Sequence, residues 1–290
     1  MNVSTSGLTV RKKEAKSILT KSPIHGNFTA NPYAGCEHNC LYCYAKYLPE
    51  WTGHEGERWG EYIDVKYWNP LTEKQKKNLN GKSVFISSAT DPYQDVEAEF
   101  KRTHALLEEL RGTGARVQIV TKSCNVVWDA DILKDLDATV SFSVNTLDEE
   151  FRKDMDNASS IEMRLEAMKY LHDRGIRTVC FISPIFPGIT DAPAIIKKVD
   201  SICDEIYLEH LVLQNPYKGS VLYYIRTKYP DLYEYYDRLF NQGDLTEWWE
   251  YDDYMEEWCK ENGYEYAYDH LPREKRDKPV VINFKGHKGK

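Results

Sequence analysis

The sequence predicts a mixed α/β fold: a partial (β/α)6 barrel of the TIM type, followed by a helical extension rich in aromatic and acidic residues. From the segment before Cys36 to residue 212, short β-prone runs alternate with helical runs at the spacing of βαβ units. None of these strands is followed by G-x-G-x-x-G, the motif that marks a dinucleotide-binding fold, so the sequence does not indicate that fold. After Asn215 the alternation stops, and Tyr- and Trp-laden runs with helical period begin.

The predicted elements follow in chain order. Residues 1–25 form a basic arm or short helix, and residues 47–79 an aromatic, charged excursion that ends in a polar helix over 71–80. After a first strand before Cys36, strands are predicted over 83–88, 116–121, 138–144, 178–185 and 205–212. The helices between them are predicted over 96–111, 128–136, 162–174 and 192–203.

The tail divides the chain further. Residues 222–240 and 245–261 are expected to be helical, with one late strand over 278–284. We therefore expect a basic N-terminal arm (1–25), a barrel (26–214) and a C-terminal helical extension that packs on the barrel (215–290).

Composition places the chain among ordinary globular proteins, with 41% hydrophobic and 29% charged residues. Eighteen apolar residues never run together, and residues 1–16 contain no apolar core of a signal peptide, so we expect no membrane partner. Four of the seven cysteines are scattered and fit no disulfide framework, which favours the reducing cytoplasm. These four are Cys124, Cys180, Cys203 and Cys259.

The net charge of −8 is concentrated in the tail. Residues 230–270 hold 13 of the 46 Asp and Glu residues but only two of the 38 Lys and Arg residues. Binding of duplex DNA depends largely on Lys and Arg neutralising phosphates. The charge pattern therefore does not favour duplex DNA as a partner. The basic arm and the near-neutral barrel are still compatible with binding of a smaller nucleic acid or binding in a local groove.

Three cysteines within eight residues, Cys36, Cys40 and Cys43, are spaced C-x3-C-x2-C. A loop this short does not accommodate internal disulfides, but its thiolates can converge on a soft metal centre. Iron–sulfur clusters normally take four cysteines, so three leave one iron open for another ligand. The alternative is a zinc site with His38 or His54 as fourth ligand, although the second C-x2-C or C-x2-H pair of a zinc knuckle is missing.

The cysteine spacing, with Tyr42 just before the last cysteine, resembles the signature of the radical S-adenosylmethionine (SAM) superfamily. The longer phrase NPYxGCxHxCxYCYA, residues 31–45, is similar to the spore-photoproduct-lyase-like branch. The resemblance implies a [4Fe–4S] cluster that holds SAM, and one-electron cleavage of SAM to a 5′-deoxyadenosyl radical. That radical abstracts hydrogen from a substrate. The resemblance also implies an ordered lid in the basic arm; a frayed terminus is the other interpretation.

Chemistry in such barrels lies where the strands end, so polar residues there are candidates. Ser88, Thr90 and Asp91 follow the strand over 83–88 and can offer hydroxyls and a carboxylate to the cofactor, or can cap the next helix. The resemblance implies that Lys122 contacts the methionine carboxylate; a solvated lysine is the alternative.

Alternation places Ser143 and Asn145 on one face at the end of the strand over 138–144. Ser143 resembles the cofactor-contacting serine of the family. Arg164 either reaches the same carboxylate or pairs along its own helix. The pair Glu209-His210, at the end of the last strand, either binds substrate or is structural.

Tyr42 matches the family's aromatic residue beside the adenine, and Tyr44 matches a tyrosine that takes part in radical transfer. The sequence departs from the branch at Ser88, where the branch has the cysteine that donates hydrogen. A serine O–H bond is too strong for that role. Cys124 can substitute for this donor, or can be a small buried apolar residue.

These observations predict a radical SAM enzyme that acts on an undetermined small-molecule, peptide or nucleic-acid substrate. The alternatives are a lyase that repairs a nucleic-acid lesion and, in another class, a zinc-stabilised binding module without catalysis. The radical chemistry requires an external one-electron donor of flavodoxin or ferredoxin type.

Overall fold

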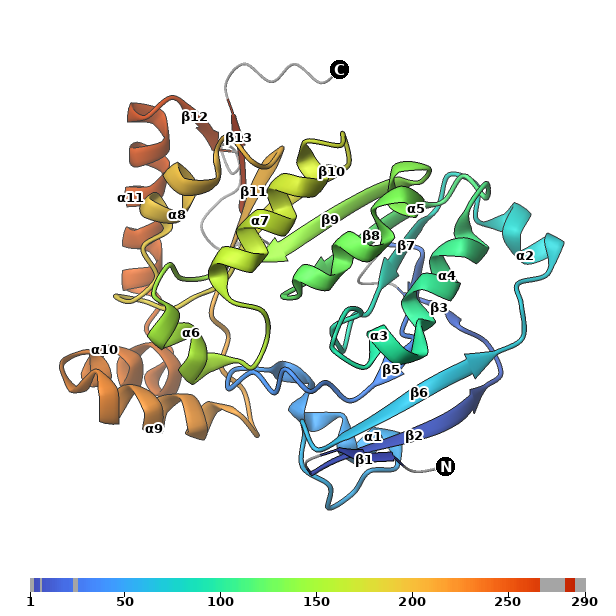
Figure 1. Cartoon of the computed structure of the whole chain (residues 1–290). Coiled ribbons are helices and arrows are strands. Elements are labelled where there is room, and N and C mark those ends of the chain that lie inside the picture. The colour runs from blue at the N-terminus through green and yellow to red at the C-terminus, as the bar shows by residue number, and fades with distance from the viewer. Residues whose placement is uncertain (1–2, 6, 23–25, 267–279, 285–290) are drawn as a thin grey trace.

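The computed structural model describes residues 3–5, 7–22, 26–266 and 280–284, so parts of the predicted arm 1–25 and extension 215–290 lie outside the described residues. The described strands form a nine-stranded sheet in the order β12-β13-β11-β10-β9-β8-β7-β4-β3 and a four-stranded sheet in the order β1-β2-β6-β5 (Figure 1). The prediction of a mixed α/β fold is confirmed.

Six neighbouring strands of the large sheet are parallel and follow one another in chain order. They are β4 (Phe28–Ala30), β7 (Ser83–Ile86), β8 (Arg116–Thr121), β9 (Asp137–Ser143), β10 (Arg177–Ile185) and β11 (Glu205–His210). The five predicted strands from residue 83 onward are confirmed, with boundaries that shift by no more than two residues. Because parallel strands share one direction, the segments that follow them gather at one edge of the sheet.

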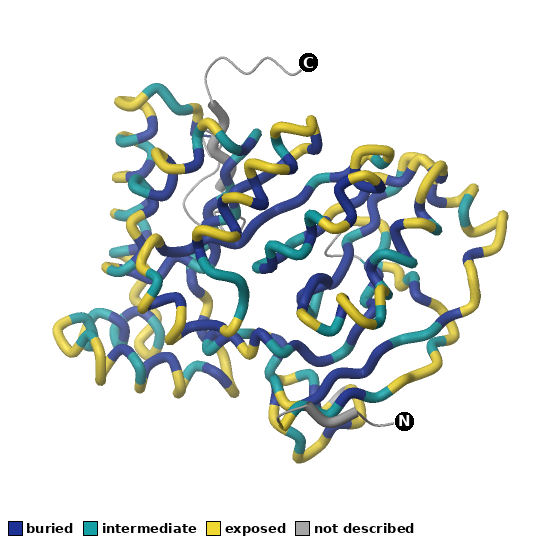
Figure 2. Tube along the Cα trace, viewed as in Figure 1, coloured by how far each residue is buried: buried dark blue, intermediate teal, exposed yellow. Residues whose placement is uncertain are grey.

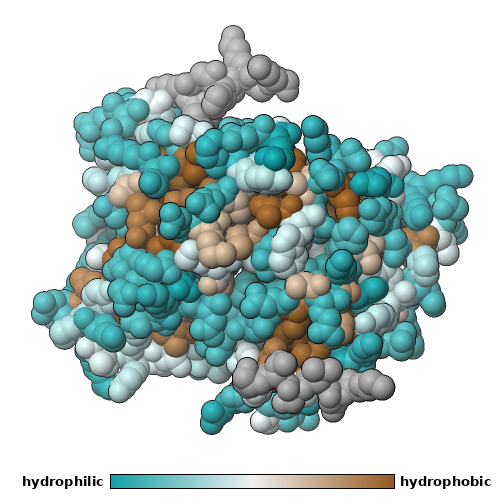
Figure 3. Space-filling view, viewed as in Figure 1, coloured by the Kyte–Doolittle hydropathy of each residue, from teal (hydrophilic) through white to brown (hydrophobic). Residues whose placement is uncertain are grey.

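The two faces of this sheet differ in polarity because side chains alternate along each strand. One face buries Ile86, Ile119, Phe142, Ile182 and Leu208 in the main hydrophobic core. Helices α4 (Arg102–Leu110), α5 (Ala130–Lys134), α7 (Ile161–His172) and α8 (Ala192–Val199) also contribute to that core. Figure 2 shows the buried trace concentrated in the strands, with exposed residues on the outer turns of the helices. Apolar atoms accordingly appear only in separate patches on the face of the molecule shown in Figure 3.

The helix predicted over 96–111 is two helices. α3 (Glu97–Phe100) ends at Lys101, which has φ 49°, and α4 begins at Arg102. The buried carboxylate of Glu97 accepts hydrogen bonds from the backbone N–H groups of Arg102, Thr103 and His104. It therefore caps α4, and the chain must turn at Lys101 to let it do so.

For residues 1–25, predicted to be a basic arm or a short helix, the helix alternative is wrong, and one strand in the excursion was not predicted. β2 (Leu8–Ala15) pairs in parallel with β6 (Tyr62–Trp68) over seven residues. Charged residues interrupt both strands, and β6 buries adjacent residues, so neither shows clean alternation. The β1 strand (Val3–Thr5) and β5 (Tyr33–Ala34) complete this sheet, while β3 (Leu19–Lys21) pairs with β4 in the large sheet.

The segment after β11 contains α9 (Lys218–Lys228), α10 (Tyr233–Asp237), a π-helical turn (Arg238–Gln242) and α11 (Thr246–Glu261). The late strand is present as β13 (Val280–Phe284), antiparallel to β11, with β12 (Tyr264–Tyr266) beyond it. No helix in the described ranges combines the length and the apolar character needed to cross a bilayer.

The remaining described elements connect these parts. They are α1 (Pro49–Thr52), α2 (Glu73–Asn78), α6 (Glu149–Met155) and the short 3-10 segments Tyr44–Tyr47, Cys124–Asp129 and Pro230–Leu232. Of these, α2 corresponds to the helix predicted over 71–80. α6 was not predicted; Asp148 caps it by accepting from the N–H groups of Glu150 and Phe151.

Replacing Glu97 by alanine is expected to lower the free energy of unfolding by about 3 kcal/mol, because three N–H groups, one buried and two partly buried, and the Tyr33 hydroxyl lose their acceptor. Urea denaturation of the cluster-free protein measures this. Glu99→Ala is the matched control, because Glu99 is exposed on the same helix. Equal losses in the two variants would contradict the capping role.

Candidate functional site

The cysteine loop, residues 35–43, leaves the small sheet at β5 and crosses the edge where the parallel strands end (Figure 1). It begins with Gly35 at φ 86°, and a Cβ atom there would lie 2.1 Å from the carbonyl oxygen of Tyr62. Only glycine allows this approach between the loop and β6. Asn39, at φ 45°, makes a second left-handed turn between Cys36 and Cys40.

Hydrogen bonds hold the loop from two sides. On one side, Gln94 donates to the Gly35 carbonyl (3.2 Å) and accepts from the Glu37 N–H (3.0 Å). On the other, the Leu41 N–H donates to the Met155 carbonyl (2.8 Å), and the Asn157 N–H donates to the His38 carbonyl (2.9 Å). Segments that follow β7 and α6 therefore fix the backbone that carries the three thiols.

The three thiols lie close enough to influence one another electrostatically. Burial, then the charge of Asp91 and the neighbouring thiols, raises the pKa of Cys36 well above its usual value. Burial raises the pKa of Cys40 to about 12, although the Lys122 ammonium opposes the shift. Burial also raises the pKa of Cys43. Such thiols become thiolates readily only when a metal centre or cation compensates the charge.

The arrangement of candidate ligands does not favour zinc. In the described part of the chain no three His, Cys, Asp or Glu side chains are placed to share one metal ion. His54 uses both ring nitrogens, toward Glu57 (2.9 Å) and Asp64 (2.8 Å), and His38 faces Asp91 (3.4 Å). A cubane spreads its cysteines over different irons, so its three sulfurs need not meet at one ion. The donor set therefore fits an iron–sulfur cluster better than a zinc ion.

Asp91 joins the ends of two strands and is already bonded. Its carboxylate accepts from the Thr121 hydroxyl (2.8 Å), the Lys122 N–H (2.7 Å) and the Tyr93 N–H (2.9 Å). Burial alone would raise its pKa, but His38 and these hydrogen bonds outweigh that effect and lower the pKa to about 2. Asp91 thus fixes the backbone of Lys122. Because its carboxylate already accepts three hydrogen bonds from the protein, a positioning role suits Asp91 better than direct contact with the cofactor.

Several polar atoms at the same edge are buried without a hydrogen-bond partner among the described residues: Ser87 Oγ, Thr90 Oγ1, Asn145 Nδ2 and the Tyr42 hydroxyl. Ser87, at φ 62°, was not predicted as a site residue. Buried polar atoms are rarely left unpaired in folded proteins, so such a group of them indicates a missing polar ligand. The atoms thus fit a cofactor with hydroxyl, amino and carboxylate groups.

The aromatic candidates lie on opposite sides of Cys43. Tyr42 is buried, packs edge-on against Phe186 and has the Lys122 ammonium 5.6 Å from its ring centre. Tyr44 is 52% exposed, and its hydroxyl donates to the backbone carbonyl of Ser88. The Ser88 hydroxyl in turn lies 3.4 Å from the Asn31 amide nitrogen. Tyr44 and Ser88 are therefore in contact through the Ser88 backbone.

Arg164 is buried in a structural network. Its guanidinium donates to the carbonyls of Ser159 (2.8 Å) and Ser143 (3.1 Å) and to the carboxylate of Asp156 (2.6 Å). These bonds tie α7 to the end of β9. Arg164 therefore holds Ser143 in place, and the alternative of a pair along its own helix is wrong.

The remaining candidates are Cys124, Glu209 and His210. Cys124 is half-buried at the start of a 3-10 turn, and its N–H donates to the Ser159 hydroxyl (2.9 Å). Glu209 accepts from the Ser183 hydroxyl (2.5 Å). His210 binds Asp252 (2.8 Å) and stacks on Trp248, so it fastens α11 to the sheet, and the structural interpretation holds for it.

Sequence reasoning missed Gln94 and Asp156. Gln94 is fully buried against the cysteine loop, and Asp156 lies between Arg164 and Arg152, near Cys40. Gln94 lies three residues after Asp91, so its position shortly after a strand end could have marked it as a candidate site residue. Asp156 follows α6 in a polar turn without a recognisable sequence motif, and only the folded structure brings it close to the cysteine loop.

Replacing Arg164 by alanine should lower the free energy of unfolding by about 3–5 kcal/mol, because it leaves Asp156 buried without its main partner. Urea denaturation of the cluster-free protein checks this. Lys169→Ala is the control, since the Lys169–Asp173 pair at the end of the same helix is exposed and should contribute little to stability. Intact stability combined with weaker SAM binding would instead show that Arg164 is a cofactor ligand.

Sequence comparisons identify relatives. A family model described as the radical SAM superfamily matches residues 30–198. An uncharacterized protein of Methanocaldococcus jannaschii is 32% identical over 232 residues, which cover 79% of this chain and 87% of the relative. An uncharacterized protein of Mycobacterium tuberculosis is 22% identical, over 82% of this chain and 75% of the relative. A radical SAM Nalpha-GlyT isomerase of Pseudomonas phage M6 is 26% identical, over 54% of this chain but only 33% of the isomerase.

Solved structures show the same fold. Spore photoproduct lyase complexed with dinucleoside spore photoproduct matches with a TM-score of 0.56 at 16% identity, over 96% of this chain and 74% of that chain. A double mutant of that enzyme with bound AdoMet and dinucleoside spore photoproduct matches with a TM-score of 0.55 at 14% identity, over the same shares. The family model covers more than half of the chain, and the archaeal relative aligns with most of it. The chain belongs to the radical SAM superfamily.

Proposed function

We propose that this radical SAM enzyme binds a [4Fe–4S] cluster through Cys36, Cys40 and Cys43, and that the reduced cluster cleaves SAM to a 5′-deoxyadenosyl radical that abstracts hydrogen from a substrate. The observation that carries the proposal is the set of three thiols on one loop, two of them buried and Cys43 half-buried, whose backbone is hydrogen-bonded from both sides. Members of the superfamily use a [4Fe–4S] cluster and SAM, and the donor set of this loop fits that cluster.

The residues at the strand ends would hold SAM. Lys122 supplies the positive charge that a carboxylate requires, and it lies near Cys40 and Cys43. Thr90 Oγ1 and Asn145 Nδ2 are buried polar atoms without a hydrogen-bond partner in the described part of the chain, and Ser88 and Ser143 add hydroxyls. Tyr42 would border the adenine. Asp91 and Arg164 would not contact SAM but would position residues that do: Asp91 holds the Lys122 backbone, and Arg164 holds the Ser143 backbone.

The architecture supports this placement. We infer that the six parallel strands form the partial (β/α)6 barrel predicted from the sequence, with residues 26–214 as its extent. The C-terminal extension, residues 215–290, would pack on it, since His210 joins α11 and β13 joins β11. The barrel mouth would then lie where the cysteine loop crosses the strand ends.

Tyr44 and Cys124 are the proposed participants in radical transfer. Tyr44 is exposed beside Cys43, and its hydroxyl is held by the Ser88 carbonyl, so its ring faces the surface at the mouth. Cys124 would supply the hydrogen that Ser88 cannot. Its contact with Ser159 places it on the same side as Arg164, whose guanidinium binds the Ser159 carbonyl.

Anaerobic reconstitution tests the proposal. We expect about four irons per chain and formation of 5′-deoxyadenosine when dithionite and SAM are added, with both lost in the triple Cys36→Ala, Cys40→Ala, Cys43→Ala variant. Cys203→Ala is the control, because Cys203 is buried beside Cys180, away from the loop. Stoichiometric zinc without iron, or full iron in the triple variant, would overturn the proposal.

A second candidate function is repair of a nucleic-acid lesion, favoured by the likeness of residues 31–45 to the spore-photoproduct-lyase-like branch and disfavoured by Ser88 and the acidic charge. If it holds, incubation with dimer-containing oligonucleotide, SAM and dithionite will restore the monomers, as measured by mass-resolved chromatography. Unchanged oligonucleotide, in a sample that still forms 5′-deoxyadenosine, would exclude this function and leave the first one standing.

A further inference from the structure

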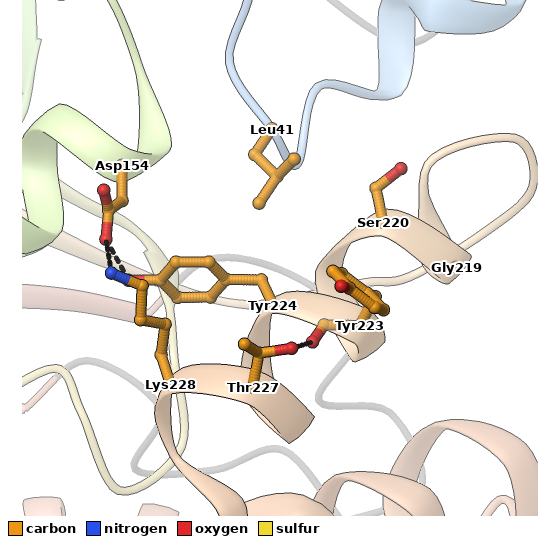
Figure 4. Close-up of a pocket in the computed structure, with 8 residues that line it drawn as sticks. All are labelled: Leu41, Asp154, Gly219, Ser220, Tyr223, Tyr224, Thr227 and Lys228. Carbon is orange, nitrogen blue, oxygen red and sulfur yellow. Dashed lines mark hydrogen bonds and ion pairs between the residues drawn. The ribbon is translucent and has the colours of Figure 1, made fainter.

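A surface groove lies against the outside of the cysteine loop. We call it the α9 groove, and it has a volume of about 560 Å³ between the loop, α6 and α9 (Figure 4). Its lining residues include Leu41, Asp154, Ser220, Tyr223, Tyr224 and Lys228. None of them is among the proposed SAM ligands, so a molecule in this groove leaves the cofactor residues free.

Leu41 connects the groove to the proposed cluster. It follows Cys40 directly in the chain, and its side chain points toward α9 (Figure 4). Its N–H is fixed by the Met155 carbonyl (2.8 Å) and its carbonyl by the Lys46 ammonium (3.1 Å). Since neighbouring Cα atoms are ~3.8 Å apart, an occupant that touches Leu41 is one residue away from a cluster ligand.

The helix α9 that borders the groove is positively charged, although the whole chain carries −8. The sequence of α9, KGSVLYYIRTK, contains three cations and no acid. The one acidic residue in the groove, Asp154, is already bound by Lys228 (3.5 Å) and by the Tyr224 hydroxyl (2.9 Å). Lys46 adds a further cation next to Leu41. An acidic partner therefore complements this surface.

The groove also offers apolar contact. Tyr223 is 63% exposed, and the Arg226 guanidinium lies 5.6 Å from its ring centre. Exposed tyrosine and arginine are the residues that most often carry the binding energy of protein interfaces. An aromatic centre with a basic rim is the composition expected of a transient protein-docking site.

We propose that the α9 groove docks an acidic one-electron carrier protein, of flavodoxin or ferredoxin type, which reduces the cluster through Leu41. The inference rests on the proposed function and adds to it the place where the reductant binds. The step transfers one electron: the carrier is oxidised by one electron and the cluster is reduced by one, with no bond made or broken in the protein.

The test compares two reductants on the reconstituted holoenzyme. Lys228→Glu and Ser220→Glu add negative charge to the groove, and Tyr223→Ala removes its exposed ring; Ser220 is exposed, so its change leaves the packing of α9 intact. With reduced flavodoxin, we expect each variant to slow cluster bleaching in the visible spectrum by at least about fivefold and to raise the Kd of the complex. The charge effects should shrink as ionic strength rises from about 0.05 M to about 0.5 M.

Dithionite needs no docking site, so its reduction rate and the resulting 5′-deoxyadenosine should be the same in all variants. Lys134→Glu on α5 and Tyr254→Ala on α11 are matched controls at exposed positions on other helices, and both should behave as wild type. Unchanged flavodoxin rates and Kd in the groove variants overturn the docking inference, and so does an equal loss with dithionite. Failure of the wild type with dithionite overturns the proposed function instead.

Discussion

The structure depends on holding three thiols beside one another on a single short loop, with Cys36 and Cys40 buried and Cys43 half-buried. Burial makes it costly for these groups to carry negative charge, as the raised pKa values of Cys36, Cys40 and Cys43 show. A metal centre removes that cost because it binds the thiolates directly. The chain also cannot relax the loop, since Gly35 is pressed against β6 and both flanks are hydrogen-bonded to segments beyond the strand ends. Local sequence supplies the ligands, and distant segments hold them in place.

The parallel strands could be predicted from short runs of β-prone residues between turns, and in some of them also from alternating burial, although β9 and β10 bury adjacent residues. In β7 and β8, residues such as Val84 and Ile119 alternate with less buried ones, and that period is visible in the sequence. β6 was not predicted because Asp64 and Lys66 interrupt its β-prone residues, although it lies between two neighbouring strands. The break at Lys101 was equally hidden. It exists because Glu97, in the preceding turn, caps the next helix, and a helical period alone does not reveal such a cap.

The candidate ligands of the site were proposed from the sequence, whereas the residues that hold them in place emerged only from the structure. The cysteine spacing and the polar residues after the strands could be read directly from the sequence. Their division into binding and positioning residues could not, because it depends on bonds across the fold. Asp91 is bonded to residues about 30 positions away, and Arg164 to Ser143 and Asp156. Thr90 Oγ1 and Asn145 Nδ2 are buried without a hydrogen-bond partner among the described residues, which is the basis for proposing them as ligands of the cofactor.

The most direct test of the central claim is electron paramagnetic resonance of the reduced, reconstituted protein with SAM labelled with ¹⁵N at its amino group. If three thiolates leave one iron open to SAM, the cluster signal will change when SAM is added and will show hyperfine coupling to the ¹⁵N label. A cluster signal that is unaffected by SAM and lacks this coupling would contradict the account, because it would mean that the fourth iron position is already occupied by the protein.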